Sequence, residues 1–201
     1  MTSPQSELAD HLRAVADSEA LLPALERVGD DLLACFASGH VLWTLGNGGS
    51  AAAAQHLAGE LVGRYLRERR PLPAVALTAD GAVMTCIGND YDHDQVFARQ
   101  VQALARPGDV VLAFTSTGRS PNVVAALAAA RARGARTVLL TGAGHAPDGG
   151  PASSHADHAL VVPHRATARV QEVHELLLHL LSERIDRWAA ASEPAPEVLP
   201  L

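Results

Sequence analysis

The sequence predicts an α/β fold in which a doubly wound, mostly parallel five-stranded sheet is flanked by helices. Short apolar runs alternate along the 201 residues with amphipathic or alanine-rich segments that have helical periodicity. Short turns join them, and an alternating strand–helix pattern of this kind favours parallel pairing through right-handed crossovers. Polar, glycine-containing turns follow two of the apolar runs, which is where such sheets bind ligands.

Five apolar runs predict the strands, at 41–45, 74–77, 110–114, 137–141 and 159–163. Helices are expected at about 4–20, 22–36, 50–62, 80–87, 96–104, 121–133 and 167–190. Residues 88–91 are interpreted as a polar loop, and 142–155 as a loop rich in glycine, proline and serine.

The chain is expected to form one domain over residues 1–191, with a helical pair at 1–39 and a flexible C-terminal tail at 192–201. The two N-terminal helices carry more apolar surface than one face of a sheet needs. They are therefore expected to pack against a partner subunit in an oligomer. The alternative is that they cover only their own sheet.

Composition and charge exclude several classes of function. The net charge of −6 argues against a general nucleic-acid-binding protein, which usually has a basic face. No apolar run approaches the ~20 residues that cross a bilayer, and the N-terminus lacks the pattern of a signal peptide. Cys35 and Cys86 lie in apolar surroundings and are expected to be reduced and buried, which predicts a cytoplasmic protein without a membrane partner.

Two turns could bind an anion through backbone N–H groups at a helix N-terminus. The first is Asn47, Gly48, Gly49 and Ser50, for which an ordinary tight turn is the alternative. The second contains Thr115, Ser116, Thr117 and Ser120, whose hydroxyls can donate to phosphate oxygens or simply cap a helix. Together the two turns favour a phosphorylated small molecule as the ligand.

A third group combines two helices. His56 and Glu60 lie four residues apart, and Gln171, Glu175 and His179 follow the same spacing on a later helix. Nitrogen and oxygen ligands from two such rows suit zinc. Solvated helix faces are the alternative, because ten histidines make chance pairs common. His174 lies off this row and is expected to pack structurally.

Several of these segments together resemble the sedoheptulose-7-phosphate isomerases, also called phosphoheptose isomerases, of the sugar isomerase (SIS) domain group. The resemblance runs from about residue 5 to residue 190. It is carried by the segments 46–50, 55–64, 88–90, 116–120 and 167–174, with His179 after them. Arg119 and Ala168 depart from the pattern of many relatives, and neither change removes a presumed ligand or base.

The resemblance implies a homotetramer with active sites between subunits, and one zinc ion per subunit held by His56, Glu60, Gln171 and His179. Glu60 and His179 are the implied acid/base pair. The implied contacts to the sugar phosphate come from Asn47, Gly48, Gly49, Ser50, Glu60, Asn89, Asp90, Thr115, Ser116, Thr117, Ser120 and Gln171.

The implied reaction converts D-sedoheptulose 7-phosphate to D-glycero-D-manno-heptose 7-phosphate through an enediol(ate), with zinc assisting. Two alternatives remain open from the sequence. One is a non-catalytic SIS protein that binds sugar phosphates, or associates with a replication initiator, for regulation. The other is an isomerase of a different ketose phosphate.

Overall fold

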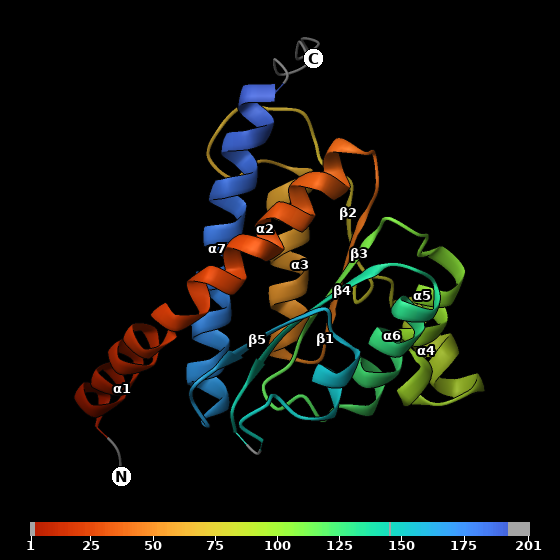
Figure 1. Cartoon of the computed structure of the whole chain (residues 1–201). Helices are drawn as coiled ribbons and strands as arrows, with labels where there is room; N and C mark the ends of the chain where they lie inside the picture. The colour runs from red at the N-terminus through yellow and green to blue at the C-terminus, as the bar shows by residue number, and fades with distance from the viewer. Residues whose placement is uncertain (1–2, 145, 193–201) are drawn as a thin grey trace.

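The structure is a computed structural model that describes residues 3–144 and 146–192. Its centre is one sheet of five parallel strands in the order β2-β1-β3-β4-β5 (Figure 1). The strands are β1 (Leu42–Gly46), β2 (Ala74–Ala76), β3 (Val110–Phe114), β4 (Arg136–Gly142) and β5 (His158–Val162). The five-stranded parallel sheet that the sequence predicts is confirmed.

Helices cover both faces of this sheet. One face is covered by α2 (Leu22–Ala37), α3 (Gly49–Val62) and α7 (Thr167–Ser192). The other is covered by α4 (Gly81–Asp90), α5 (Ala98–Leu104) and α6 (Pro121–Ala132). The first helix is α1 (Pro4–Asp17). The short helix η1 (Ser18–Leu21) joins it to α2, η2 (His93–Gln95) lies between α4 and α5, and η3 (Pro151–His155) lies between β4 and β5.

Strand β3 shows why the sheet needs cover on both sides. All five of its residues are buried. Val110, Leu112 and Phe114 pack into the core beneath α2, α3 and α7. Val111 and Ala113 alternate with them and pack into the core beneath α5 and α6. A continuous apolar run is therefore compatible with a central parallel strand.

The strand order indicates where a ligand site is expected. β1 and β3 are neighbours in the sheet, with Gly46 paired to Phe114 at their carboxyl ends. The helix that follows β1 lies on one face of the sheet, and the helix that follows β3 lies on the other. The loops after these two strands diverge, and the space between them is the usual ligand crevice of an open α/β sheet.

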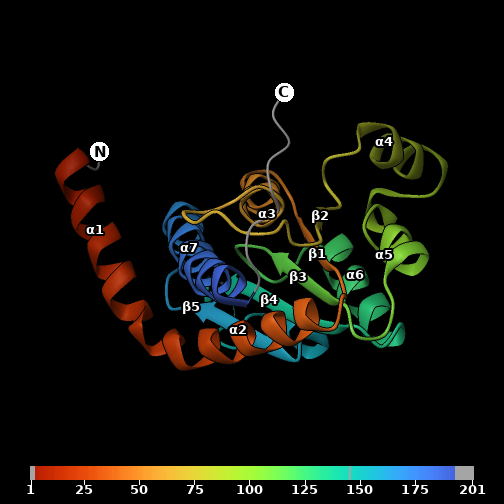
Figure 2. The same cartoon turned by 90° about the horizontal axis from the view of Figure 1, so that it is seen from above.

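Helix α1 lies at one side of the molecule, where it contacts α7 through His11 and Glu172 (Figure 2). Ala14 is its buried residue, whereas Leu8 and Leu12 are 59% and 60% exposed. In this chain, then, the N-terminal helix does not lie wholly over its own sheet, and its outer leucines remain available to a partner.

Three details differ from the sequence-based expectations. Residues 88–90 are not a loop, because α4 continues through Asp90, with the Tyr91 amide donating to the Ile87 carbonyl. Both cysteines are free thiols, and Cys35 is buried as expected, but Cys86 is exposed on α4. Helix α7 runs to Ser192, and residues 193–201 of the predicted tail lie outside the described residues.

Within the described part of the chain, no helix combines the length and apolarity that crossing a membrane requires.

Candidate active site

A pocket of about 300 Å³ lies at the carboxyl ends of β1 and β3, and we call it the loop pocket. It is lined by residues of the two turns and of the first turns of α7: Asn47, Gly48, Gly49, Ser50, Phe114, Thr115, Ser116, Ser120, Thr167 and Gln171. The N-termini of α3 and α6 begin at these turns, so their N–H groups and partial positive charge favour an anion there.

Two glycines let the backbone adopt the conformation of these turns. Gly48 precedes α3 with a φ of 55°, in the region that side chains disfavour. Gly118 has a φ of 64°, and a Cβ at this position would lie 1.7 Å from the carbonyl oxygen of Gly149. The second turn is therefore packed from behind by the 149–150 segment, which holds its backbone in place.

Asn47 is held by a buried partner. The amide groups of Asn47 and Asn122 exchange two hydrogen bonds, each of 2.9 Å. Asn122 is 2% exposed and belongs to α6, so the pair ties the first turn to the helix that follows the second. Sequence reasoning missed Asn122, because it lies outside both turns.

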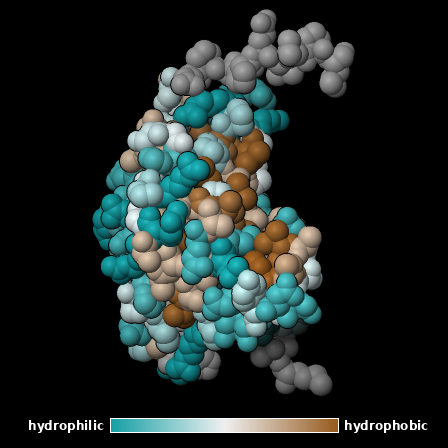
Figure 3. Space-filling model, turned by 90° about the vertical axis from the view of Figure 1, so that its right-hand side faces the viewer, coloured by the Kyte–Doolittle hydropathy of each residue, from teal (hydrophilic) through white to brown (hydrophobic). Residues whose placement is uncertain are grey.

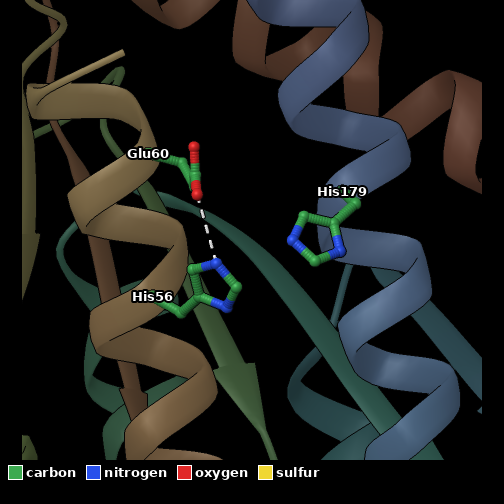
Figure 4. A group of neighbouring side chains, drawn as sticks. All are labelled: His56, Glu60 and His179. Carbon is green, nitrogen blue, oxygen red and sulfur yellow. Dashed lines mark hydrogen bonds and ion pairs between the residues drawn. The ribbon is translucent and has the colours of Figure 1, made fainter. Parts of the chain in front are cut away.

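The second part of the site is a cluster of three side chains, His56, Glu60 and His179, which we call the helix cluster. His56 and Glu60 project from α3 toward His179 on α7 (Figure 4). One potential ligand atom from each lies within 4.8 Å of the other two. The Nε2 atom of His56 is 3.2 Å from Oε1 of Glu60, and the two histidine rings meet edge-on with centroids 4.9 Å apart.

The helix cluster fits a zinc ion in its chemistry. Two imidazoles and a carboxylate are common zinc ligands, and ligand atoms on a tetrahedral ion at ~2.1 Å are about 3.4 Å apart. The His56–Glu60 separation of 3.2 Å is close to that value. Gln171, the fourth predicted ligand, instead has its amide against Gly49, where a Cβ would be 2.7 Å from Nε2. It lines the loop pocket, one helical turn before Glu175.

Glu175 is part of the site although the sequence assigned it no role. Its Oε2 atom lies 2.8 Å from Nδ1 of His56. The signal was present in the sequence, since Glu175 lies midway between Gln171 and His179 on one helical row.

A buried ion pair holds α3 and α7 beside each other. The Arg69 side chain is fully buried, with Nε 3.2 Å from Oδ1 of the almost fully buried Asp186 on α7. Its two Nη atoms donate to the carbonyl oxygens of Glu60 and Leu61, both at 2.7 Å. Arg69 therefore caps the end of the helix that carries Glu60 and connects it to α7.

His174 lies in the core beneath the loop pocket. It is 1% exposed, its ring contacts that of Phe114, and Nε2 is 3.4 Å from the Thr141 carbonyl oxygen. Burial lowers the pKa of this histidine to about 4, so the neutral ring is the stable form. It packs structurally, as the sequence predicts.

The structure brings most of the predicted contact residues together, but not all. Glu60 lies in the helix cluster and not in the loop pocket. Thr117 does not line the loop pocket either; its hydroxyl accepts a hydrogen bond from the Arg119 amide at 3.3 Å. Asn89 and Asp90 also do not line it. Their side chains are exposed and bond to each other at 2.8 Å on α4, which both views place across the molecule from α7. Thr167, which was not predicted as a contact, does line the pocket.

A larger hollow, of about 550 Å³, lies at the opposite edge of the sheet, at the amino ends of the strands. Asp31, His40, Arg131 and Arg136 are among its lining residues, and Nε of Arg136 is 3.3 Å from Asp31. It lacks both the helix N-termini and the helix cluster. Size alone does not identify the active site here.

The sequence and the fold of this chain are similar to those of known proteins. The SIS domain model matches residues 5–142. The phosphoheptose isomerase of Pelobacter propionicus is 47% identical over 165 residues, covering 82% of this chain and 85% of that protein. The structure of phosphoheptose isomerase from Neisseria gonorrhoeae is similar with a TM-score of 0.85 at 40% identity, covering 91% and 96% of the two chains. The structure of a phosphoheptose isomerase from Francisella tularensis is similar with a TM-score of 0.84 at 34% identity, covering 93% of this chain and 100% of that chain.

Proposed function

Because this chain belongs to the phosphoheptose isomerases of the SIS-domain family and is a sugar-phosphate isomerase, we propose that it converts D-sedoheptulose 7-phosphate to D-glycero-D-manno-heptose 7-phosphate. The observation that carries this proposal is the proximity of Glu60 and His179 across two helices that also line the loop pocket. A non-catalytic SIS protein has no need of such a pair.

The spacing along α3 suits a long phosphorylated sugar. Gly49 lines the loop pocket and His56 lies seven residues later, which is about 10 Å along the helix axis. An extended seven-carbon sugar can therefore keep its terminal phosphate in the loop pocket with C1 and C2 at the helix cluster. The phosphate then contributes binding energy that orients the distant reacting carbons.

In the proposed reaction, Glu60 takes a proton from C1 of the ketose, which gives a cis-enediol(ate). A proton is then delivered to C2, while the C1 hydroxyl loses its proton and the C2 oxygen gains one, which gives the aldose. His179 lies opposite Glu60 and serves as the proton donor. Gln171 and Asn47 line the loop pocket and would orient the sugar hydroxyls nearest to it.

We propose zinc as the resident metal, held by His56, Glu60 and His179, with Gln171 rotating from the loop pocket as the fourth ligand. When bound, zinc would polarise the carbonyl and stabilise the negative charge that develops on oxygen. A carboxylate has two oxygens, so Glu60 can hold the metal with one and accept the proton with the other.

We also propose a cytoplasmic homotetramer in which neighbouring copies complete each site. Three features support the association of copies. Leu8 and Leu12 are exposed on α1. Apolar patches are visible on the side that carries α4 and α5 (Figure 3), where a hollow is lined by Val75, Leu77, Val83, Ile87 and Leu104 among others. Finally, Asn89 and Asp90 would have to act on a neighbouring copy's site.

The reaction is tested by the conversion of sedoheptulose 7-phosphate by the purified full chain. Glu60→Gln and His179→Gln should each lower kcat by about 10²–10⁴-fold. Glu68→Gln is the control, because the Glu68 side chain is 70% exposed and forms its ion pair with Arg64, away from the cluster. Unchanged turnover in both site variants would exclude Glu60 and His179 as the acid/base pair. Faster turnover of another ketose phosphate would show that sedoheptulose 7-phosphate is not the preferred substrate.

The assembly is tested by mixing two inactive variants. If Asp90 acts across an interface, co-refolded Glu60→Gln and Asp90→Asn subunits should regain part of the activity that each lacks alone. No recovery, together with a monomeric mass in solution, would contradict the shared site.

A further inference from the structure

We propose that Glu175 is a positioning residue that fixes the tautomer of His56, so that Nε2 of His56 offers its lone pair to the metal. The inference rests on the zinc site in the proposed function. It concerns a residue that touches neither the proposed metal nor the sugar, and that acts through His56.

The two ring nitrogens of His56 have different partners. Nδ1 lies 2.8 Å from Oε2 of Glu175, whereas Nε2 lies 3.2 Å from Oε1 of Glu60. An ionised carboxylate only accepts hydrogen bonds, and a neutral imidazole has one N–H to donate. The shorter contact assigns that N–H to Nδ1, where Glu175 accepts it.

This assignment leaves Nε2 with a lone pair that faces the carboxylate of Glu60. Two acceptors at 3.2 Å repel each other unless a positive charge lies between them. A metal ion bound between Nε2, Glu60 and His179 supplies that charge. The arrangement of the two carboxylates around His56 therefore favours metal binding at Nε2 and proton retention at Nδ1.

The position of Glu175 makes this contact across two helices. Glu175 belongs to α7 and His56 to α3, 119 residues apart in sequence. The Glu175 side chain is 41% exposed, so burial alone does not force it into the site. Carboxylates that accept from a metal-binding histidine orient its ring and raise its basicity, and their loss typically costs about 10–100-fold in metal affinity.

The same helix offers a matched control. Glu172 lies one turn earlier on α7 and also pairs with a histidine, with Oε2 2.7 Å from Nδ1 of His11. Its side chain is 36% exposed, similar to that of Glu175. Replacing Glu172 therefore removes a similar His–carboxylate contact, together with its ion pair to Arg169, without touching His56.

The test is a zinc titration of the metal-free full chain against a chromophoric chelator. We expect Glu175→Leu to raise the zinc Kd by about 10–100-fold. Glu175→Gln, whose Oε1 can still accept the Nδ1–H, should raise it less, and Glu172→Gln should leave it unchanged. Wild-type affinity in Glu175→Leu, or an equal loss in Glu172→Gln, would overturn the inference.

A second measurement keeps the inference separate from the proposed function. In the metal-free protein, the ¹⁵N chemical shifts of the His56 ring report which nitrogen carries the proton. We expect the Nδ1–H form in the wild type and a shift toward Nε2–H in Glu175→Leu, which a merely structural role would not produce. If the wild type binds no zinc, the proposed metal is wrong. The tautomer of His56 in Glu175→Gln and Glu175→Leu, measured without metal, still shows whether Glu175 fixes the position of the ring proton.

Discussion

The loop pocket and the helix cluster are built in different ways, although they share α3 and α7. The loop pocket uses backbone and short side chains at the ends of two neighbouring strands, and its glycines fix the path of the chain. The helix cluster uses longer side chains from two helices that are distant in sequence, with Glu60 on α3 and His179 on α7. The glycines of the turns set part of their backbone conformation, whereas the cluster exists only once the two helices have packed.

The difference shows in what holds each part in place. The turns of the loop pocket depend partly on local backbone conformation, such as the φ of 64° at Gly118. They are also held by longer-range contacts, with Gly149 packed behind Gly118 and Asn122 paired to Asn47. The helix cluster depends on the separation of two helices, which the buried pair of Arg69 and Asp186 fixes. The backbone conformation of a binding turn is therefore encoded in part by its own glycines, whereas this acid/base pair requires the packed tertiary structure.

The largest expected effect is on the helix cluster. Arg69→Met removes the buried partner of Asp186 and the donors to the Glu60 and Leu61 carbonyls. We expect the free energy of unfolding to fall by about 3–5 kcal/mol. At a temperature where the variant is still folded, zinc affinity should fall more than phosphate affinity. The helix cluster lies wholly on α3 and α7, whereas most residues of the loop pocket come from the turns after β1 and β3.

Urea unfolding and the two titrations check this prediction. The control is Arg187→Met, which removes the pair between the exposed Arg187 and the half-buried Glu183. Because Glu183 keeps its pair with Arg67, this should cost less than about 1 kcal/mol. Equal losses in both variants, or an equal fall in both affinities, would remove the distinction between the two regions.

The next effect concerns the core beneath the loop pocket. Burial lowers the pKa of His174 to about 4 from an ordinary value of 6.5, so between these values the unfolded chain binds more protons than the folded one. The stability from this group is present above pH 6.5 and is lost as the pH falls toward 4. We expect a loss of about 3 kcal/mol over that interval.

Unfolding curves at several pH values measure this contribution. In His174→Gln the fall in stability between pH 6.5 and pH 4 should be smaller by about the same amount. An unchanged pH dependence in that variant would show that His174 does not carry it.

A smaller effect is expected from a substitution on α3 that changes the loop pocket and leaves the helix cluster in place. In Gly49→Ala the new Cβ would lie 2.7 Å from Nε2 of Gln171, so that amide must move. We expect KM for the sugar phosphate to rise about tenfold, which is about 1.4 kcal/mol, with a smaller change in kcat. Gly59→Ala is the matched control on α3, because a Cβ there meets nothing within 4 Å. A similar KM in both variants would contradict the role of the Gly49–Gln171 contact.

The smallest effect is expected at the rim of the loop pocket. Thr167 is exposed, and its hydroxyl lies 3.4 Å from that of Ser116. Thr167→Val keeps the shape and removes the hydroxyl, so KM should rise by about two- to fivefold, in line with one lost hydrogen bond of about 0.5–1 kcal/mol. Steady-state kinetics test this, and a loss of kcat without a change in KM would argue against a binding role.

Much of the fold could be predicted from the sequence because it depends on local patterns. The apolar runs mark the strands, and Pro121 and Gly134 mark the start and the end of a helix. The prediction failed at 88–90, where glycine and asparagine suggested a loop but α4 continues. Packing of Ile87 into the core outweighs the weak helical propensity of those residues.

Patterns along the chain were enough to establish the alternation of strands and helices, the two polar turns and the helical rows that contain Glu60 and His179. Each depends on residues that are close in sequence. The folded chain was needed to establish that β1 and β3 are neighbours, that Glu175 meets His56, and that Asn89 and Asp90 lie away from the loop pocket. These facts depend on the packing of distant segments, which no local pattern specifies.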